Sequence, residues 1–445
     1  MSENRKFFIA ALGCPKNLVE SELIAGAFLA GNDQLCFNAD DADIYIINTC
    51  AFLPEARAEA AAEIAQAVEW KLAGTDRKIA VAGCLMNHVQ FPEFKAYFPE
   101  VDLWCKINDT AKIRDLLDGR ANPSRRKKCT YLCNEKMPRM QLTLPHVSYL
   151  KICDGCNNCC AYCAIPSLRG ELRSRSMKSI LAEAKMLIGN GVKELIIIAQ
   201  DITAYGDDLP DGGSLSELLE KLEEIPGDFV IRLLYTHPAH YTPDFIETVA
   251  KSKKILPYLD MPLQHISERI LAAMNRHTDG KTIRELIATL RKKIPDLTLR
   301  TTFITGLPGE SEEEFAELCD FVREYKFDRL GVFAFAPEPG TPAAEMPGQI
   351  AQDIAESRAE KLMNIQAEIM KQNQLRKLGR KMRVLVDYID DGFAYARGAM
   401  DAPDIDNMII FPASRSVKAG EFVNVTAVKS MKNDLIAEKE RAVKR

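Results

Sequence analysis

Apolar runs of strand length alternate with longer amphipathic segments over roughly the first quarter of the chain. The runs FFIAALG, DADIYIINT and KIAVAG are separated by NLVESELIAGAFLAG and by the Ala/Glu-rich EARAEAAAEIAQAVEWKLAG. In the longer segments the apolar residues recur with the 3.6-residue period of a helix. Strands joined by helices in this way predict a parallel sheet. We therefore expect an N-terminal α/β domain at residues 5–120.

The alternation resumes after a segment with Gly, Pro and basic residues at 119–140, which we interpret as a linker. Six further apolar runs then follow, with segments such as SMKSILAEAKMLI and ESEEEFAELCDFVREY between them. Six β/α units with short loops predict a full or partial TIM-like barrel at residues 142–375, with the active site at the carboxyl ends of its strands. The runs are HVSYLKI, ELIIIAQ, FVIRLLY, PYLDMPL, LTLRTTFI and RLGVFAF.

The end of the chain has a different pattern. Short β-like runs, MRVLVDYI, GFAYARG, NMIIF and EFVNVTAV, are divided by Gly, Pro and Asp. This pattern predicts a small OB-like β-barrel at residues 378–445, a kind of module that binds extended polymers.

Composition narrows the class of protein. Of the 445 residues, 47% are hydrophobic and 27% are charged, as in a globular protein of several domains. The longest aliphatic run, LIIIA, is far shorter than the ~20 residues of a membrane span, so we expect a cytoplasmic protein with no membrane partner. The net charge of −5 argues against a chain that coats nucleic acid nonspecifically.

Five of the 13 cysteines lie in the string CDGCNNCCAYC, which begins at Cys153. In a reducing compartment, clustered thiols are metal ligands or catalysts more often than disulfides. Cys153, Cys156, Cys159 and Cys163 fit the C-x2-C-x2-C-x3-C run of bacterial ferredoxins, but without the proline that follows that run or a second copy of it. The alternative set, Cys156-x3-Cys160-x2-Cys163, would leave one iron of a four-iron cluster open to a reactant.

We favour the set with the open iron, because the motif directly follows the first predicted barrel strand, where the catalytic mouth would lie. A zinc site would need a second pair of ligands, and the other close pair, Cys129 and Cys133, lies in the linker. Cys36, Cys105 and Cys319 we interpret as structural, and Cys153 and Cys159 as spare thiols beside the cluster.

Three N-terminal cysteines occupy equivalent positions in the predicted sheet. Cys14, Cys50 and Cys84 each come directly after one of its strands. Any one of them could be a buried small hydrophobic residue. Ligands, however, gather outside the carboxyl ends of parallel strands, so three cysteines at this place predict a second three-ligand cluster.

These residues carry a resemblance to a known superfamily. The C-x3-C-x2-C motif on a β/α barrel is similar to that of the radical S-adenosylmethionine enzymes, which cleave S-adenosylmethionine to methionine and a 5′-deoxyadenosyl radical. With the N-terminal cysteine domain and a final barrel that would be a TRAM domain, nearly the whole chain resembles the methylthiotransferases of that superfamily. Strings such as LGCPKNLVESE, IPSLRGELRSR and LIIIAQDITAYG are similar to the branch that modifies a ribosomal protein.

The resemblance implies an enzyme that adds a methylthio group to the β-carbon of an aspartate in small-subunit ribosomal protein S-twelve. A tRNA adenosine methylthiotransferase is the alternative, and a noncatalytic RNA-binding or electron-carrying protein is disfavoured by the acidic balance and the open-iron motif. The implied cofactors are two 4Fe-4S clusters, an auxiliary one on the N-terminal cysteines and one on the central motif, and S-adenosylmethionine as radical source and methyl donor. An electron donor such as flavodoxin or ferredoxin and a sulfur source would be partners.

Placement at strand ends also suggests contacts with S-adenosylmethionine. Gln200 and Asp201 follow the run ELIIIA, and Arg300 and Gly306 lie in and after LTLRTTFI. Because reactants bind at the carboxyl ends of barrel strands, these four are the candidates.

The predicted terminal barrel is acidic. Residues 384–428 carry seven acidic side chains against three basic ones, which gives a net charge of −4. Carboxylates repel RNA phosphates and attract basic protein loops. We therefore expect Asp401, Asp404 and Asp406 to form a surface that binds the protein substrate, with an ordinary solvated acidic face as the alternative.

Overall fold

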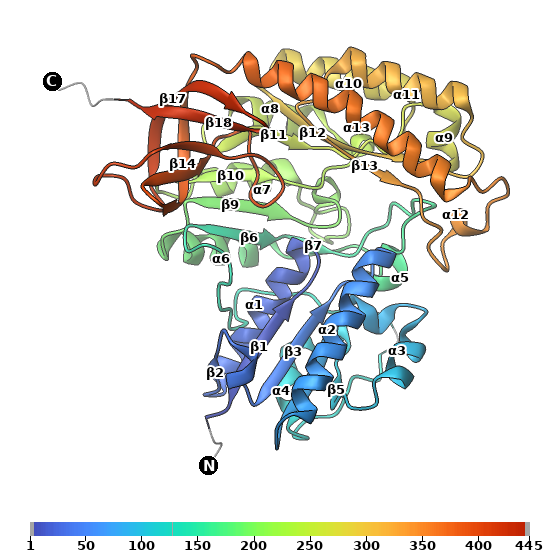
Figure 1. The fold of residues 1–445 in the computed structure, drawn as a ribbon, viewed down its shortest axis with the longest axis vertical. Helices are drawn as coiled ribbons and strands as arrows, with labels where there is room; N and C mark the ends of the chain where they lie inside the picture. The colour runs from blue at the N-terminus through green and yellow to red at the C-terminus, as the bar shows by residue number, and fades with distance from the viewer. Residues whose placement is uncertain (1–3, 127, 441–445) are drawn as a thin grey trace.

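The computed structural model describes residues 4–126 and 128–440. The N-terminal part, blue in Figure 1, is a sheet in the order β2-β1-β3-β4-β5 in which every pair is parallel. β3 is buried along its whole length, as expected for a parallel strand with both faces covered. The strands are β1 (Lys6–Ala11), β2 (Gln34–Leu35), β3 (Ile44–Thr49), β4 (Lys78–Gly83) and β5 (Leu103–Trp104). The helices are α1 (Pro15–Ala30), α2 (Pro54–Leu72), α3 (Phe91–Tyr97) and α4 (Ile113–Leu117).

The central part is a six-stranded parallel sheet in the order β13-β12-β11-β10-β9-β6. No pairing joins β6 to β13 among the described residues, so the barrel is open. The strands are β6 (Val147–Lys151), β9 (Glu194–Ile198), β10 (Val230–Leu233), β11 (Ile255–Asp260), β12 (Thr298–Thr305) and β13 (Arg329–Ala334), with β7 (Cys153–Asp154) paired to β8 (Arg173–Ser174) outside the sheet. The helices are α5 (Ile165–Arg169), α6 (Met177–Gly189), α7 (Leu215–Glu223), α8 (Pro243–Lys251), α9 (Glu268–Ala273), α10 (Gly280–Lys293), α11 (Glu312–Tyr325), α12 (Pro342–Glu345) and α13 (Gln352–Leu375).

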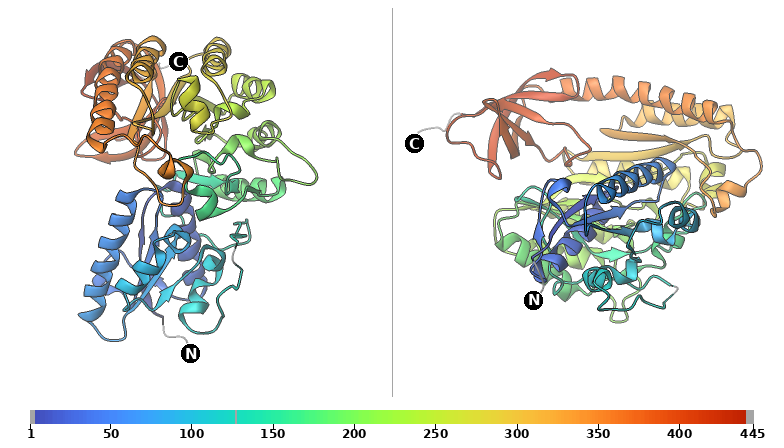
Figure 2. Two further views of the ribbon diagram at one scale, coloured as in Figure 1. Left: turned by 90° about the vertical axis from the view of Figure 1, so that its right-hand side faces the viewer. Right: turned by 60° about the horizontal axis from the view of Figure 1, so that its bottom comes forward.

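The C-terminal part, red in Figure 1, is a closed barrel in the order β14-β15-β16-β18-β17. It follows the long helix α13, which runs along the outside of the central part, while the N-terminal sheet forms a separate body beside the β6 edge (Figures 1 and 2). The fold class expected from the sequence is confirmed, and no described helix is long and apolar enough to cross a membrane. The strands are β14 (Lys381–Asp390), β15 (Phe393–Arg397), β16 (Ile409–Pro412), β17 (Phe422–Met431) and β18 (Asp434–Lys439).

A loop of the small barrel, residues 398–408, packs against the amino-terminal ends of the central strands. Arg329, the first residue of β13, donates to Asp401 Oδ1 at 2.6 Å. The hydroxyl of Tyr258 in β11 donates to Asp406 Oδ2 at 2.7 Å. These side chains are buried, so the loop closes this end of the open barrel.

Glu194, the first residue of β9, also links the central part to the C-terminal barrel. It is 1% exposed and accepts from Arg232 Nε at 2.6 Å and from Arg397 of the small barrel. Arg397 also donates to Asp387 Oδ2 at 2.6 Å. Burial raises the pKa of Glu194, but the guanidinium groups of Arg232 and Arg397 outweigh it, so the pKa lies below its ordinary value.

These contacts correct the expected acidic docking surface. The side chains of Asp401 and Asp406 are 3% and 2% exposed and bind Arg329, so neither is available to a protein substrate. Asp404 is exposed. The prediction was wrong for two of its three residues because a charge count along one segment does not show that the partner cations come from another domain.

We expect Glu194→Gln to destabilise the protein by about 3–5 kcal/mol, because it leaves two buried guanidinium groups without their shared carboxylate. Urea unfolding at pH 7, followed by far-UV circular dichroism, measures this loss. Since the folded pKa of Glu194 is lowered, its stabilising effect is present above the unfolded pKa near 4.5 and fades as pH falls through the folded pKa.

The control for this prediction is Asp404→Asn. Asp404 is exposed and has a left-handed φ of 65°, which asparagine also adopts, so its unfolding midpoint should stay within error of the parent. Equal midpoints for Glu194→Gln and the parent at pH 7 would contradict the importance of the buried pairs.

Candidate active site

The cysteines that follow the strands meet at one cavity between the N-terminal and central sheets. Its volume is about 330 Å³. The N-terminal trio follows β1, β3 and β4, and the central trio lies between β7 and α5. Because the carboxyl ends of parallel strands gather at one edge of each sheet, both trios face the same space. All six line it: Cys14, Cys50, Cys84, Cys156, Cys160 and Cys163.

Two glycines let the N-terminal loops approach one another. Gly13 has a φ of +84°, and a Cβ atom on it would lie 2.4 Å from the Cβ of Cys50. Gly83 has a φ of +101°, and a Cβ atom there would lie 2.3 Å from the carbonyl oxygen of Thr49. A side chain at either position would push the cysteine loops apart.

Arg169 of α5 connects the central part to the N-terminal trio. Its buried guanidinium donates to Cys84 Sγ at 3.1 Å and to Asn17 Oδ1 at 2.6 Å. It also pairs with Glu20 of α1. Burial raises the pKa of Cys84 to about 12, and the positive charge of Arg169 opposes that rise. The guanidinium therefore favours the thiolate form of Cys84, the form that binds metal.

Two further buried charges complete this network. Lys151 Nζ lies 2.9 Å from Glu20 Oε1 and 3.0 Å from Asp154 Oδ2. Arg169 Nη1 lies 3.5 Å from the same oxygen of Asp154. Burial disfavours the charged form of Lys151, but the carboxylates of Asp154 and Glu20 reverse this and raise its pKa. Two cations and two carboxylates thus compensate one another where α1 packs on β6.

The central trio has its own guanidinium. Arg276 Nη1 donates to Cys160 Sγ at 3.4 Å, and its Nη2 donates to the carbonyl oxygen of Pro262 at 2.6 Å. The backbone N–H of Cys163 donates to the carbonyl oxygen of Cys160 at 3.0 Å. This turn brings both thiols to the cavity, and Arg276 places a positive charge beside one of them.

The thiols of neither trio are close enough to share a single metal ion as they stand. Sulfur atoms that share one zinc ion at ~2.3 Å lie within about 4 Å of one another. Throughout residues 4–126 and 128–440, no three cysteine sulfurs lie within 4.8 Å of one another. Burial raises the pKa of Cys156 to about 11 and that of Cys163 to about 12. Without a metal these thiols therefore keep their protons at neutral pH, and a bound metal would replace the protons. Three soft sulfur donors on each side suit iron–sulfur clusters.

The other two cysteines of the central string are placed differently. Cys153 lies in β7, is fully buried and donates to the carbonyl oxygen of Asp201 at 3.7 Å. Cys159 is exposed and has a left-handed φ of 50°. Neither lines the cavity. The arrangement favours the ligand set that contains Cys160 over the ferredoxin set.

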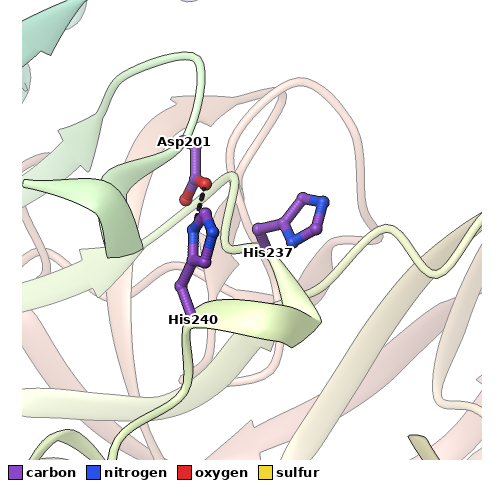
Figure 3. Close-up of side chains that lie close together, drawn as sticks. All are labelled: Asp201, His237 and His240. Carbon is purple, nitrogen blue, oxygen red and sulfur yellow. Dashed lines mark hydrogen bonds and ion pairs between the residues drawn. The ribbon is translucent and has the colours of Figure 1, made fainter. Parts of the chain in front are cut away.

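Figure 3 shows Asp201 and two histidines, which follow β9 and β10. Asp201 Oδ2 accepts from His240 Nδ1 at 2.8 Å, the contact dashed in Figure 3. The same oxygen also accepts from Asn158 Nδ2 at 2.8 Å. The hydrogen bond to Asp201 raises the pKa of His240, whereas burial lowers the pKa of His237 to about 3. His237 Nδ1 accepts from the N–H of Ala239 at 3.3 Å, so the neutral ring carries its proton on Nε2. This Nε2 is buried and has no hydrogen-bond partner among the described residues.

Two of the four residues expected to contact S-adenosylmethionine line the cavity, namely Gln200 and Asp201. Arg300 and Gly306 are not among the lining residues. Arg300 instead pairs with Asp260 at 2.8 Å, and Gly306 is enclosed by α13.

The sequence analysis missed other residues that line the cavity, among them a tyrosine, a histidine, a lysine and two arginines. Tyr235 and His237 follow β10, so the strand-end rule could have found them. Lys16 stands two positions after Cys14. Arg169 and Arg276 come from α5 and from the loop after α9, where no pattern marks them.

Comparisons with known proteins identify all three parts. Residues 150–322 match the Radical SAM superfamily, residues 378–439 match the TRAM domain, and residues 6–106 match a family described as Uncharacterized protein family UPF0004. The radical S-adenosylmethionine methyltransferase TsrM from Kitasatospora setae has a TM-score of 0.55 at 13% identity and covers 77% of each chain. The cobalamin-dependent radical enzyme OxsB has a TM-score of 0.52 at 12% identity, covering 83% of this chain and 56% of its own. These two likenesses show the fold alone.

Relatives of known name cover almost the whole chain. Ribosomal protein uS12 methylthiotransferase RimO of Geobacter sulfurreducens is 40% identical over 442 residues, which are 97% of this chain and 98% of the relative. The enzyme of the same name from Desulforamulus reducens is 40% identical over 97% of this chain and 98% of its own. That of Pelotomaculum thermopropionicum is 41% identical over 97% and 99%.

An open β/α barrel with C-x3-C-x2-C at its mouth defines a radical S-adenosylmethionine enzyme, a class that uses a 4Fe-4S cluster and S-adenosylmethionine. The second cysteine trio and the TRAM barrel narrow the class to the methylthiotransferases that the sequence resembles. The chain belongs to the RimO family of ribosomal protein uS12 methylthiotransferases.

The two competing ligand sets differ in one testable pair of thiols. We expect Cys159→Ser to keep the full iron content and the cleavage of S-adenosylmethionine, because its thiol is exposed and away from the cavity. Cys160→Ser should lose the cluster of the central trio. Iron analysis and product chromatography on anaerobically reconstituted protein measure both, and the reverse pattern would establish the ferredoxin set.

Proposed function

We propose that this chain attaches a methylthio group to the β-carbon of an aspartate side chain in ribosomal protein uS12. The observation that carries the proposal is that two cysteine trios from two domains line one cavity. An unactivated C–H bond offers no leaving group or acidic proton, so the group that removes hydrogen and the group that presents sulfur must reach the same carbon. The similarity to RimO over 97% of the chain supports the same substrate.

We assign one 4Fe-4S cluster to each trio. Cys156, Cys160 and Cys163 would hold the cluster that binds S-adenosylmethionine, beside Gln200 and Asp201. The N-terminal trio would hold the auxiliary cluster. When bound, these groups and S-adenosylmethionine supply the electron transfer, the hydrogen-abstracting radical, the sulfur and the methyl group.

The side chains of the protein supply placement, charge and a dry site. Arg169 and Arg276 each donate to one thiol of a trio, and a cation beside a sulfur stabilises its negative charge. Asp201 holds Asn158 and so fixes the loop of the central trio to the end of β9. Apolar faces of Phe52 and Tyr162 line the cavity and would exclude water from the reacting carbon once the substrate covers them.

The reaction also needs reactants from other proteins. We expect an electron donor such as flavodoxin or ferredoxin and a separate sulfur source, since each turnover consumes electrons and transfers one sulfur atom to the substrate. We expect the protein to work in the cytoplasm, where free thiols stay reduced.

Mass spectrometry tests the substrate directly. Cells that express the chain should show one methylthio group on an aspartate of uS12, and cells without it or with Cys160→Ser should show none. The tRNA of the same cells is the comparison sample. Methylthiolated adenosine in tRNA that depends on the chain, with unmodified uS12, would overturn the proposal.

Iron content tests the two clusters. Replacing Cys156, Cys160 and Cys163 together by Ala should leave about half of the iron, because thiolate ligation is local and the other trio lies in another domain. Replacing Cys14, Cys50 and Cys84 should also leave about half, and should keep S-adenosylmethionine cleavage while abolishing methylthiolation. If either variant lost all of its iron, or lost no iron, the assignment of two independent cluster sites would be contradicted.

A further inference from the structure

Lys16 extends from the second position of α1 into the cavity between the two domains. The residue is 9% exposed and lines the cavity. Its Nζ lies 3.2 Å from the centroid of the Tyr235 ring, which belongs to the central part. Tyr235 has a left-handed φ of 65°, and its N–H donates to Asp260 Oδ2 at 3.0 Å. The backbone of Tyr235 is thus held in a conformation that a bulky residue adopts only under constraint, and this fixes the position of its ring beside the ammonium.

The ammonium of Lys16 forms no ion pair with a carboxylate in the part of the chain that the structure describes, since no carboxylate oxygen lies within 4.0 Å of its Nζ. The thiol of Cys14 and the carboxylate of Asp260 act on its charge from the surroundings. The neighbouring buried cation Lys151 has two such partners, Glu20 and Asp154. Buried lysines are rare without a partner, and the ring of Tyr235 compensates only part of the lost hydration. An unpaired cation on a cavity wall is therefore a site for an anion that enters the cavity.

Cys14 acts on the charge of Lys16, but in the proposed function all six thiols of the two trios bind iron. Each trio also has a hydrogen-bond donor of its own: Arg169 donates to Cys84, and Arg276 donates to Cys160. His237, two residues after Tyr235, offers a second unpaired donor to the same cavity, since its buried Nε2 has no described partner. Two donors from different domains without partners indicate a ligand with acceptor oxygens.

We infer that Lys16 binds the carboxylate of the substrate side chain that is modified. This inference rests on the proposed function, in which the reacting atom is the β-carbon of an aspartate. That carbon is bonded to the carboxylate carbon, so an ammonium that holds the carboxylate fixes the β-carbon in the same cavity as both trios. The charge-assisted contact also distinguishes aspartate from its neutral isostere asparagine.

The test compares uS12 with a uS12 variant in which the modified aspartate is asparagine. The anaerobically reconstituted full chain should bind the aspartate form roughly ten- to a hundredfold more tightly. Lys16→Met should bring the ratio of the two dissociation constants close to one. Because the ratio is measured on one preparation, a partly folded or partly loaded sample does not change it.

Lys185→Met is the matched control, because Lys185 lies on the exposed side of α6 and should keep the parental ratio. A Lys16→Met protein that still prefers aspartate as strongly as the parent would overturn the inference. The inference would also be overturned if Lys16→Met lost the iron of the N-terminal trio but kept the parental ratio of dissociation constants. Lys16 would then support the auxiliary cluster rather than bind the substrate. Failure of the parent chain to modify uS12 would instead overturn the proposed function, so the two failures are distinguishable.

Discussion

The relative position of the two cysteine trios depends on four charges buried between α1 and the central part. Glu20, Lys151, Asp154 and Arg169 alternate in sign and compensate one another. Removing one partner of such a set leaves a buried charge that neither water nor protein stabilises, which is far more costly than losing an exposed pair. The network therefore favours one docking geometry over small sliding motions of the N-terminal sheet, and the chemistry needs a single geometry because both trios must reach one carbon.

Arg169 gives this network a direct link to the site. The same guanidinium that pairs with Glu20 also donates to Cys84, so domain docking and the environment of a candidate ligand share one side chain. Arg276 plays the corresponding part for Cys160. Hydrogen bonds to ligand sulfurs are one way in which proteins adjust iron–sulfur centres, and here each trio has its own donor.

Much of the architecture follows from local pattern. Buried runs such as IYIINT can be strands, and a cysteine directly after one must lie at the carboxyl edge of a parallel sheet, which places Cys50 and its counterparts correctly in the cavity. The same rule places Gln200 and Asp201 there. It does not place Arg300, whose side chain turns to Asp260 within the barrel.

Contacts between domains could not be predicted in this way. Asp401 and Asp406 count as surface charge in the sequence, and only the fold shows that Arg329 meets them from another domain. Arg169 and Arg276 likewise reach the thiols from the five-residue helix α5 and from a loop, both too short for a periodic pattern. Whether Lys16 has a counter-ion depends on which residues surround it in space, and no sequence spacing reveals that.

The loop at 398–408 has a consequence for the inside of the open barrel. It covers the amino-terminal ends of the strands, while the cavity lies at their carboxyl ends, and Ala402 of the loop packs with Ile196 and Tyr258 in the apolar interior. Among the described residues, the amino-terminal end of the barrel is thus plugged by apolar and paired side chains, so a reactant would approach the cavity from the carboxyl ends of the strands.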